Sequence, residues 1–119
     1  MLNSLLGQVL DIKGVTSAAV VNAEGFILEG TSEGDKDLSF VGGVIASGLA
    51  SSHVLAELLG EGDISQTMIE YEDGPVLLIP LKTEQEHVMV ATLESINTLG
   101  RARFQLRKLL PEITDAVEA

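Results

Sequence analysis

The chain has 119 residues, which is enough for one domain with a single core, and 45% of them are hydrophobic while only 3% are aromatic. We therefore expect one globular domain, residues 1–119, packed by aliphatic side chains. A formal net charge of −11 disfavours nucleic-acid binding, and the absence of cysteine excludes disulfides and thiolate metal sites, so we expect a cytoplasmic protein.

The N-terminal segment predicts a helix with a single apolar face. Its apolar residues recur at helical spacing and stop at Gly14, which suits the left-handed backbone of a helix C-terminus. These residues are Leu2, Leu5, Leu6, Val9 and Leu10, followed by Lys13. The segment lacks the basic leader and cleavage site of a signal peptide, so we expect it to belong to the folded domain.

Residues 15–29 predict a β-hairpin. Residues 15–21 (VTSAAVV) form its first strand, residues 22–25 form a turn in which Gly25 accommodates positive φ, and residues 26–29 run back. A polar loop follows at residues 30–36, and Asp35 or Asp37 is expected to cap the next helix.

Residues 37–60 predict a long helix with more apolar surface than one chain can cover. At about 100° per residue, one apolar stripe suits a core and a second lies roughly opposite, so the second needs another partner. The first stripe contains Leu38, Val41, Ile45, Leu49, Ala56 and Leu59, and the second contains Phe40, Val44, Ser47, Ser51, Val54, Leu55 and Leu58. A narrow strip between them is small and weakly polar, which suits a transient contact: Ser39, Ala46, Ala50, His53 and Glu57.

The same helix contains an uncharged run at residues 40–56 that approaches the length of a membrane span. Its Ser, Gly and Ala content, and the charge of Glu57 immediately after it, argue against insertion. We therefore expect no membrane insertion.

Three further strands are predicted after Gly60 and Gly62. Residues 65–72 alternate, with Thr67, Ile69 and Tyr71 on one face, as in an edge strand. Asp73-Gly74 predicts a two-residue turn, and the continuously apolar residues 76–79 (VLLI) predict a central strand. Residues 83–86 form a polar turn into a last strand at residues 87–93.

The chain is expected to end in a helix with one apolar face, in which Pro111 causes a kink or starts a new turn. Its apolar positions are Leu99, Ala102, Leu106, Leu109, Leu110, Ile113 and Val117. The order helix-strand-strand-helix-strand-strand-strand-helix predicts an α+β fold, an α/β two-layer sandwich with a five-stranded antiparallel sheet.

Enzymatic chemistry finds little support in the sequence. Ser51, Ser52 and His53 are consecutive on a helix and point about 100° apart, so they cannot form an aligned nucleophile and base. His87 follows Glu86 at the start of a strand and is expected to be simply exposed. With no metal-ligand spacing and no phosphate-binding loop, we expect no catalytic residue, metal or cofactor.

Four of the seven basic residues gather near the C-terminus: Arg101, Arg103, Arg107 and Lys108. One interpretation is a solvated helix face that offsets Glu112 and Asp115, and the other is a contact with an anion or a protein. The sequence leaves the role of this segment open.

In its ordered elements the chain resembles the roadblock family of dynein light-chain proteins, and more closely its small bacterial members of the MglB type. The resemblance rests on the first helix ending at Gly14, on residues 15–28 (VTSAAVVNAEGFIL), on the small-residue helix, and on residues 71–81 (YEDGPVLLIPL). It implies a profilin-like fold, and a homodimer in which the third strands pair and the long helices pack side by side. The implied interface residues are Phe40, Val44, Ser47, Ser51, Val54, Leu55, Leu58, Thr67, Ile69 and Tyr71.

The resemblance also implies a regulatory role without catalysis by this chain. Roadblock dimers bind small Ras-like GTPases, and in some bacterial systems they stimulate GTP hydrolysis or act as scaffolds in polarity, motility and signalling. Here the strip of Ser39, Ala46, Ala50, His53 and Glu57 is the expected contact for the GTPase. The alternative is a small-molecule sensor, since profilin-like folds also hold ligands, and it predicts a cavity under the first or last helix.

Overall fold

The computed structural model covers residues 1–119 and describes residues 1–33 and 41–119, with the backbone alone for residues 41–43, 45 and 46. Five strands form one antiparallel sheet in the order β2-β1-β5-β4-β3. The helices are α1 (Leu2–Leu10), α2 (Val41–Leu59), the short η1 (Ile96–Thr98) and α3 (Leu99–Glu118). The strands are β1 (Val15–Asn22), β2 (Ile27–Ser32), β3 (Thr67–Tyr71), β4 (Gly74–Leu81) and β5 (His87–Leu93). The expected α+β fold class is confirmed.

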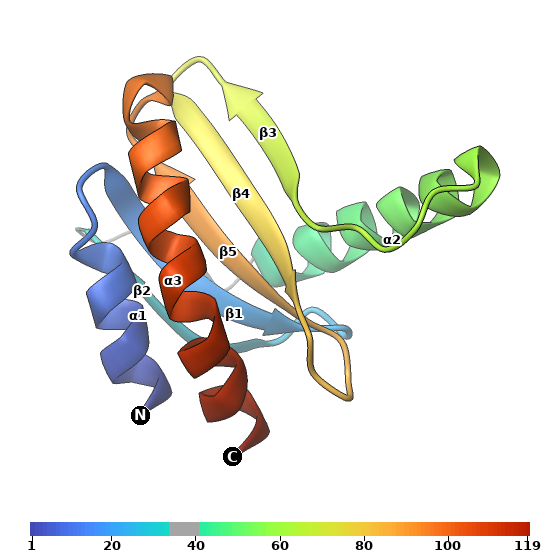
Figure 1. The fold of residues 1–119 in the computed structure, drawn as a ribbon, viewed down its shortest axis with the longest axis horizontal. Coiled ribbons are helices and arrows are strands. Elements are labelled where there is room, and N and C mark those ends of the chain that lie inside the picture. The colour runs from blue at the N-terminus through green and yellow to red at the C-terminus, as the bar shows by residue number, and fades with distance from the viewer. Residues whose placement is uncertain (34–40) are drawn as a thin grey trace.

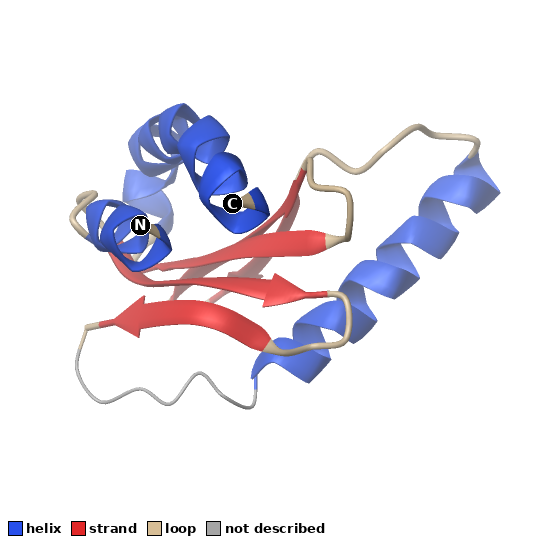
Figure 2. Ribbon diagram, turned by 90° about the horizontal axis from the view of Figure 1, so that it is seen from below, coloured by secondary structure: helices blue, strands red, loops and turns tan. Residues whose placement is uncertain are grey.

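The helices cover the two faces of the sheet unequally (Figures 1 and 2). Helices α1 and α3 lie together on one face, where Leu6, Val9 and Leu106 join the larger core. Helix α2 crosses the other face, over a small core of Val21, Leu49, Leu78, Val88 and Val90. Because β1, β4 and β5 are covered on both faces, their sequences are almost continuously apolar rather than alternating.

Of the two turns predicted at glycines, the one at Gly25 is confirmed and the one at Gly74 is shifted along the chain. Gly25 adopts φ 90° as expected, and the Asn22 side-chain oxygen accepts the backbone N–H groups of Glu24 and Phe26. The two-residue turn predicted at Asp73-Gly74 is shifted by one position, because Gly74 pairs with Tyr71 and leaves Glu72 and Asp73 in the turn. Gly74 has φ 144°, and its backbone lies so close to the Leu93 carbonyl that a Cβ would overlap it.

The remaining expectations about the strands are largely confirmed. Strand β3 is an edge strand, and residues 76–79 lie in the interior strand β4, although β5 is the middle strand of the sheet. Strand β2 runs to Ser32, beyond the predicted end at Glu29, because Gly30 and Thr31 still pair with β1. The predicted caps Asp35 and Asp37 lie outside the described residues.

One expectation about the helices needs correction. In the core stripe of α2, Leu49 is buried (2% exposed), but Leu59 is 65% exposed because the helix leaves the sheet before its end (Figure 1). Leu38 lies outside the described residues. Helix α3 continues from Leu99 to Glu118 as one element with Pro111 inside it, and a kink at Pro111 stays a prediction.

We expect Gly74→Ala to lower the free energy of unfolding by about 1–3 kcal/mol or more, because alanine is strained at this φ and its Cβ meets the Leu93 carbonyl. Urea unfolding at one fixed protein concentration measures the change. Gly7→Ala in α1 is the matched control, since nothing lies within 4 Å of a Cβ there. Equal unfolding midpoints for the two variants would contradict this account of the turn.

Candidate functional site

The most prominent surface feature is an uncovered apolar face on α2. Among the α2 side chains that the structure describes, only Leu49 is buried. On the side of the helix away from Leu49, large apolar side chains are open to solvent: Val44 (74% exposed), Val54, Leu55 and Leu58 (78% exposed). The C-terminal half of the helix extends past the edge strand β3 (Figure 1). Exposed apolar surface of this extent usually marks an interaction site.

Strand β3 presents a second apolar surface on the same side of the sheet. Ile69 pairs with Val76, and Thr67 pairs with Leu78; Leu78 belongs to the core beneath α2, and Val76 packs against that core. Because directly paired residues of antiparallel strands face the same side, Thr67, Ile69 and Tyr71 also face the α2 side. Ile69 is 43% and Tyr71 59% exposed.

The backbone of β3 has a free edge, and its register shows which groups are unpaired. Glu70 lies opposite Pro75, which has no N–H, so this pair is of the non-hydrogen-bonded type. Ile69 and Tyr71 therefore bond to β4, whereas the N–H and C=O groups of Met68 and Glu70 point away from β4. An edge of this kind is a template for another strand.

The residues expected at a dimer interface thus lie on one side of the molecule. Val44, Ser47, Ser51, Val54, Leu55 and Leu58 of α2 are exposed, and so are Ile69 and Tyr71 of β3, while Thr67 is partly buried. Phe40 lies outside the described residues. Their role at an interface stays a prediction.

The predicted partner-binding strip is joined to the sheet by one polar contact. His53 Nε2 lies 3.1 Å from Glu86 Oε1, so the ring N–H donates to this carboxylate of the β4–β5 turn. Ala50, His53 and Glu57 are all exposed, but Ser39 lies outside the described residues, and for Ala46 only the backbone is described. The role of this strip also stays a prediction.

Sequence reasoning missed the neighbours of this strip. A hollow of about 270 Å³ beside His53 is lined by Asn22 and Ala23 of the β1–β2 turn and by Glu86 of the β4–β5 turn. The two turns meet because Asn22 pairs with His87 across β1 and β5. No local signal shows this, since it depends on the order of strands in the sheet.

The histidines and serines form no catalytic arrangement among the residues described. Ser52 Oγ donates to the Gly48 carbonyl (3.0 Å), and His53 contacts Glu86. The expectation that His87 is simply exposed is wrong, since it is half-buried and its Nδ1 lies 2.8 Å from the Gln85 carbonyl and 3.0 Å from Thr83 Oγ1. The turn that precedes the strand therefore orients this ring.

The described part of the chain contains no group of three or more His, Asp or Glu side chains placed to hold a metal ion. None of its helices combines the length and the apolar character needed to cross a membrane.

A larger hollow of about 830 Å³ lies beside α3. Apolar side chains of Leu110 and Pro111 in α3 and Ile79 and Leu81 in β4 line it, together with charged groups of both signs such as Arg107 and Asp115. It lies next to the last helix, whereas the sensor alternative expects a cavity under the first or last helix.

Comparison with known proteins agrees with this architecture. The family model described as the Roadblock/LC7 domain matches residues 1–94. The fold is similar to Myxococcus xanthus MglB, with a TM-score of 0.87 at 18% identity, covering 98% of this chain and 94% of that one. It is also similar to the gliding protein MglB of Thermus thermophilus, with a TM-score of 0.84 at 20% identity over 99% and 90% of the two chains.

Sequence comparison adds an uncharacterized protein of Methanocaldococcus jannaschii, 24% identical over 113 residues, which are 95% of this chain and 96% of that protein. The solved structures share the fold at low sequence identity, whereas the family model matches the sequence itself over most of its length. The chain belongs to the Roadblock/LC7 domain family.

Proposed function

We propose that this protein is a homodimeric, non-enzymatic adaptor that binds and regulates a small Ras-like GTPase. The observation that carries the proposal is the uncovered apolar face of α2 together with the free edge of β3 on the same side of the sheet. A second copy related by a twofold axis would cover both at once.

The overhang of α2 supports this arrangement. If β3 paired with its mate, the partner's sheet would continue past the edge, beneath the C-terminal half of α2 (Figure 1). Leu59, which faces the core side in the helical pattern but is 65% exposed, would then cover the partner's sheet. The opposite stripe, with Val44 and Leu55, would pack against the partner's α2.

Regulation of a GTPase is the part of the proposal supported by the family and by what such a dimer leaves exposed. Ala50, His53 and Glu57 lie between the two apolar stripes, beside the β4–β5 turn. The GTPase would contact this strip, and the protein would act either by stimulating GTP hydrolysis or as a scaffold.

The sensor function is the second candidate, and the hollow beside α3 is the observation in its favour. The low aromatic content, 3%, supports it poorly, because ligand pockets are usually rich in aromatic and other apolar side chains. A thermal-shift screen of small molecules separates the two candidates.

We expect Val44→Glu and Leu55→Glu each to break the dimer, because each would bury an unpaired charge between the two helices. Light scattering at micromolar concentration should show a monomer for both variants and a dimer for the natural protein. Ile96→Glu, at a 45% exposed apolar position outside this face, is the control and should remain dimeric. A natural protein that is monomeric would refute the interface.

The register of β3 gives a second test of the dimer. Glu70→Pro should weaken association by removing an outward-facing N–H, while leaving the β3–β4 bonds intact. Light scattering of a dilution series measures the association. Tyr71→Pro removes the bond to Gly74 as well as an expected interface side chain, so it should lower the melting temperature in addition to weakening association. Glu70→Pro with unchanged association would exclude strand pairing at this edge.

Binding to the GTPase is tested with the immobilised protein and the Ras-like GTPase that co-purifies with it, loaded with GDP or with GTP. Ala50→Arg or Glu57→Arg should weaken binding by about tenfold or more without dissociating the dimer. Glu112→Arg on α3 is the matched control. Absence of binding in both nucleotide states at micromolar concentration would end the GTPase proposal, and single-turnover hydrolysis distinguishes an activator from a scaffold.

A further inference from the structure

The outer face of α3 carries an exposed aromatic ring. Ala102, Leu106 and Ile113 are buried against the sheet and α1, and Phe104 lies on the opposite side of the helix, 63% exposed. The whole chain contains only three phenylalanines and one tyrosine. A phenylalanine in this position contributes little to the core of its own chain.

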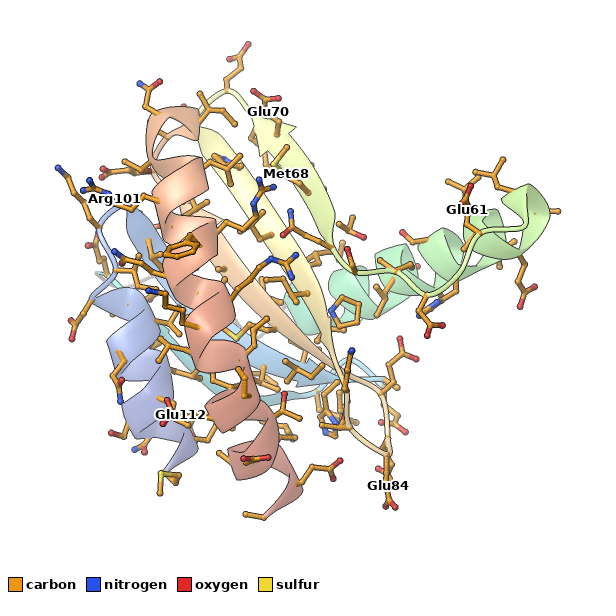
Figure 3. The ribbon with its side chains drawn as sticks, viewed as in Figure 1. Glu61, Met68, Glu70, Glu84, Arg101 and Glu112 are labelled. Carbon is orange, nitrogen blue, oxygen red and sulfur yellow. The ribbon has the colours of Figure 1, made fainter. Side chains whose placement is uncertain are left out.

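Four cations surround this ring within two helical turns: Arg101, Arg103, Arg107 and Lys108. Lys108 Nζ lies 4.4 Å from the centroid of the Phe104 ring, a cation–π contact. Arg107 Nη2 donates to Gln66 Oε1 at 3.1 Å. Figure 3 shows Arg101 on the side of α3 away from β3.

The carboxylates that the structure describes do not neutralise this group. Among the described residues a carboxylate approaches a basic side chain within 4 Å where Glu86 contacts His53, and none lies within 4 Å of any of the four cations. Glu112 and Asp115, which the sequence offered as counter-charges on the same helix, form no such pair. Although the chain has a net charge of −11, these four cations therefore have no carboxylate partner among the described residues.

From these observations we infer that the outer face of α3 binds an acidic peptide segment of another protein, in which carboxylates flank one apolar side chain. The apolar side chain would pack on Phe104, and the carboxylates would pair with the arginines, whose guanidinium groups can bind them through two hydrogen bonds. Arginine and exposed aromatic residues are the types that contribute most to binding at protein interfaces.

The charge distribution favours a peptide over a larger polyanion. The strongly acidic remainder of the chain repels a nucleic acid or an anionic membrane, which extend far beyond the four cations. A short acidic peptide lies close to the four cations and is attracted by them. Salt screens its repulsion by the acidic groups that lie more than about 8–10 Å away.

Arg107 approaches the proposed dimer and GTPase surfaces, since it bonds to Gln66 beside β3 and lines the hollow that also reaches His53. The rest of the face lies on the opposite side of the sheet from α2 (Figure 2), so a peptide bound at Phe104, Arg101 and Lys108 would leave both α2 surfaces free. Failure of peptide binding would therefore leave the proposed dimer and GTPase binding unaffected, and the reverse also holds.

Fluorescence anisotropy with the 119-residue chain tests the inference. The probe is a labelled short peptide of Asp and Glu with one central Leu, compared with the same peptide carrying Asn and Gln, and with one carrying Gly for Leu. We expect the acidic Leu peptide to bind at least about tenfold more tightly than either of the other two peptides. Its affinity should fall as the salt concentration is raised.

Matched variants place the binding on α3. Arg101→Glu/Lys108→Glu and Phe104→Ala should each weaken binding by about tenfold. Lys13→Glu/Lys82→Glu, with the same charge change elsewhere, and Phe26→Ala, at another exposed phenylalanine (70%), should not. Melting curves of all four should match the natural protein, because the altered side chains are exposed.

Three results would overturn the inference. These are no binding of the acidic Leu peptide, equal binding to the Arg101→Glu/Lys108→Glu variant and the natural protein, and tighter binding to phosphatidylserine vesicles or single-stranded DNA than to the peptide. The last result would assign the face to a polyanion instead of a peptide.

Discussion

Contact between α2 and the sheet through Leu49 is the interaction on which the arrangement of this protein depends. The interior strands are apolar on both faces, so each face must be covered, and α1 with α3 can cover only one of them. Helix α2 covers the other, but the small core there, with Leu49 against Val21, Leu78 and Val88, reaches only part of the helix. The rest of α2 projects past β3 with its apolar side chains exposed.

Because this contact is partial, the sheet face under α1 and α3 is fully covered, whereas the face under α2 is not. The α1 and α3 face is a closed core, whereas the α2 face combines an overhanging helix with an edge strand whose Met68 and Glu70 backbone groups are unpaired. Both incomplete features lie on one side, which is why the proposed dimer would cover them together. The chain belongs to the Roadblock/LC7 domain family, and its described residues present these two surfaces for contact.

The cations also lie apart from the apolar face of α2. They gather on the outer face of α3, while α2 covers the other side of the sheet. The proposed dimer and the inferred peptide site would therefore occupy opposite faces of the sheet.

The sequence by itself determined the elements and their order, because helical and strand periodicity, together with the glycines at Gly14 and Gly25, are local signals. It also determined that α2 has two apolar stripes and that β3 is an edge strand. The tertiary structure alone decided that Leu59 is exposed, that Glu86 contacts His53, and that Glu72 and Asp73 form the turn. The first two depend on where the helix leaves the sheet and on strand order, which are set by contacts between segments distant in sequence, and the third depends on the register in which Tyr71 pairs with Gly74.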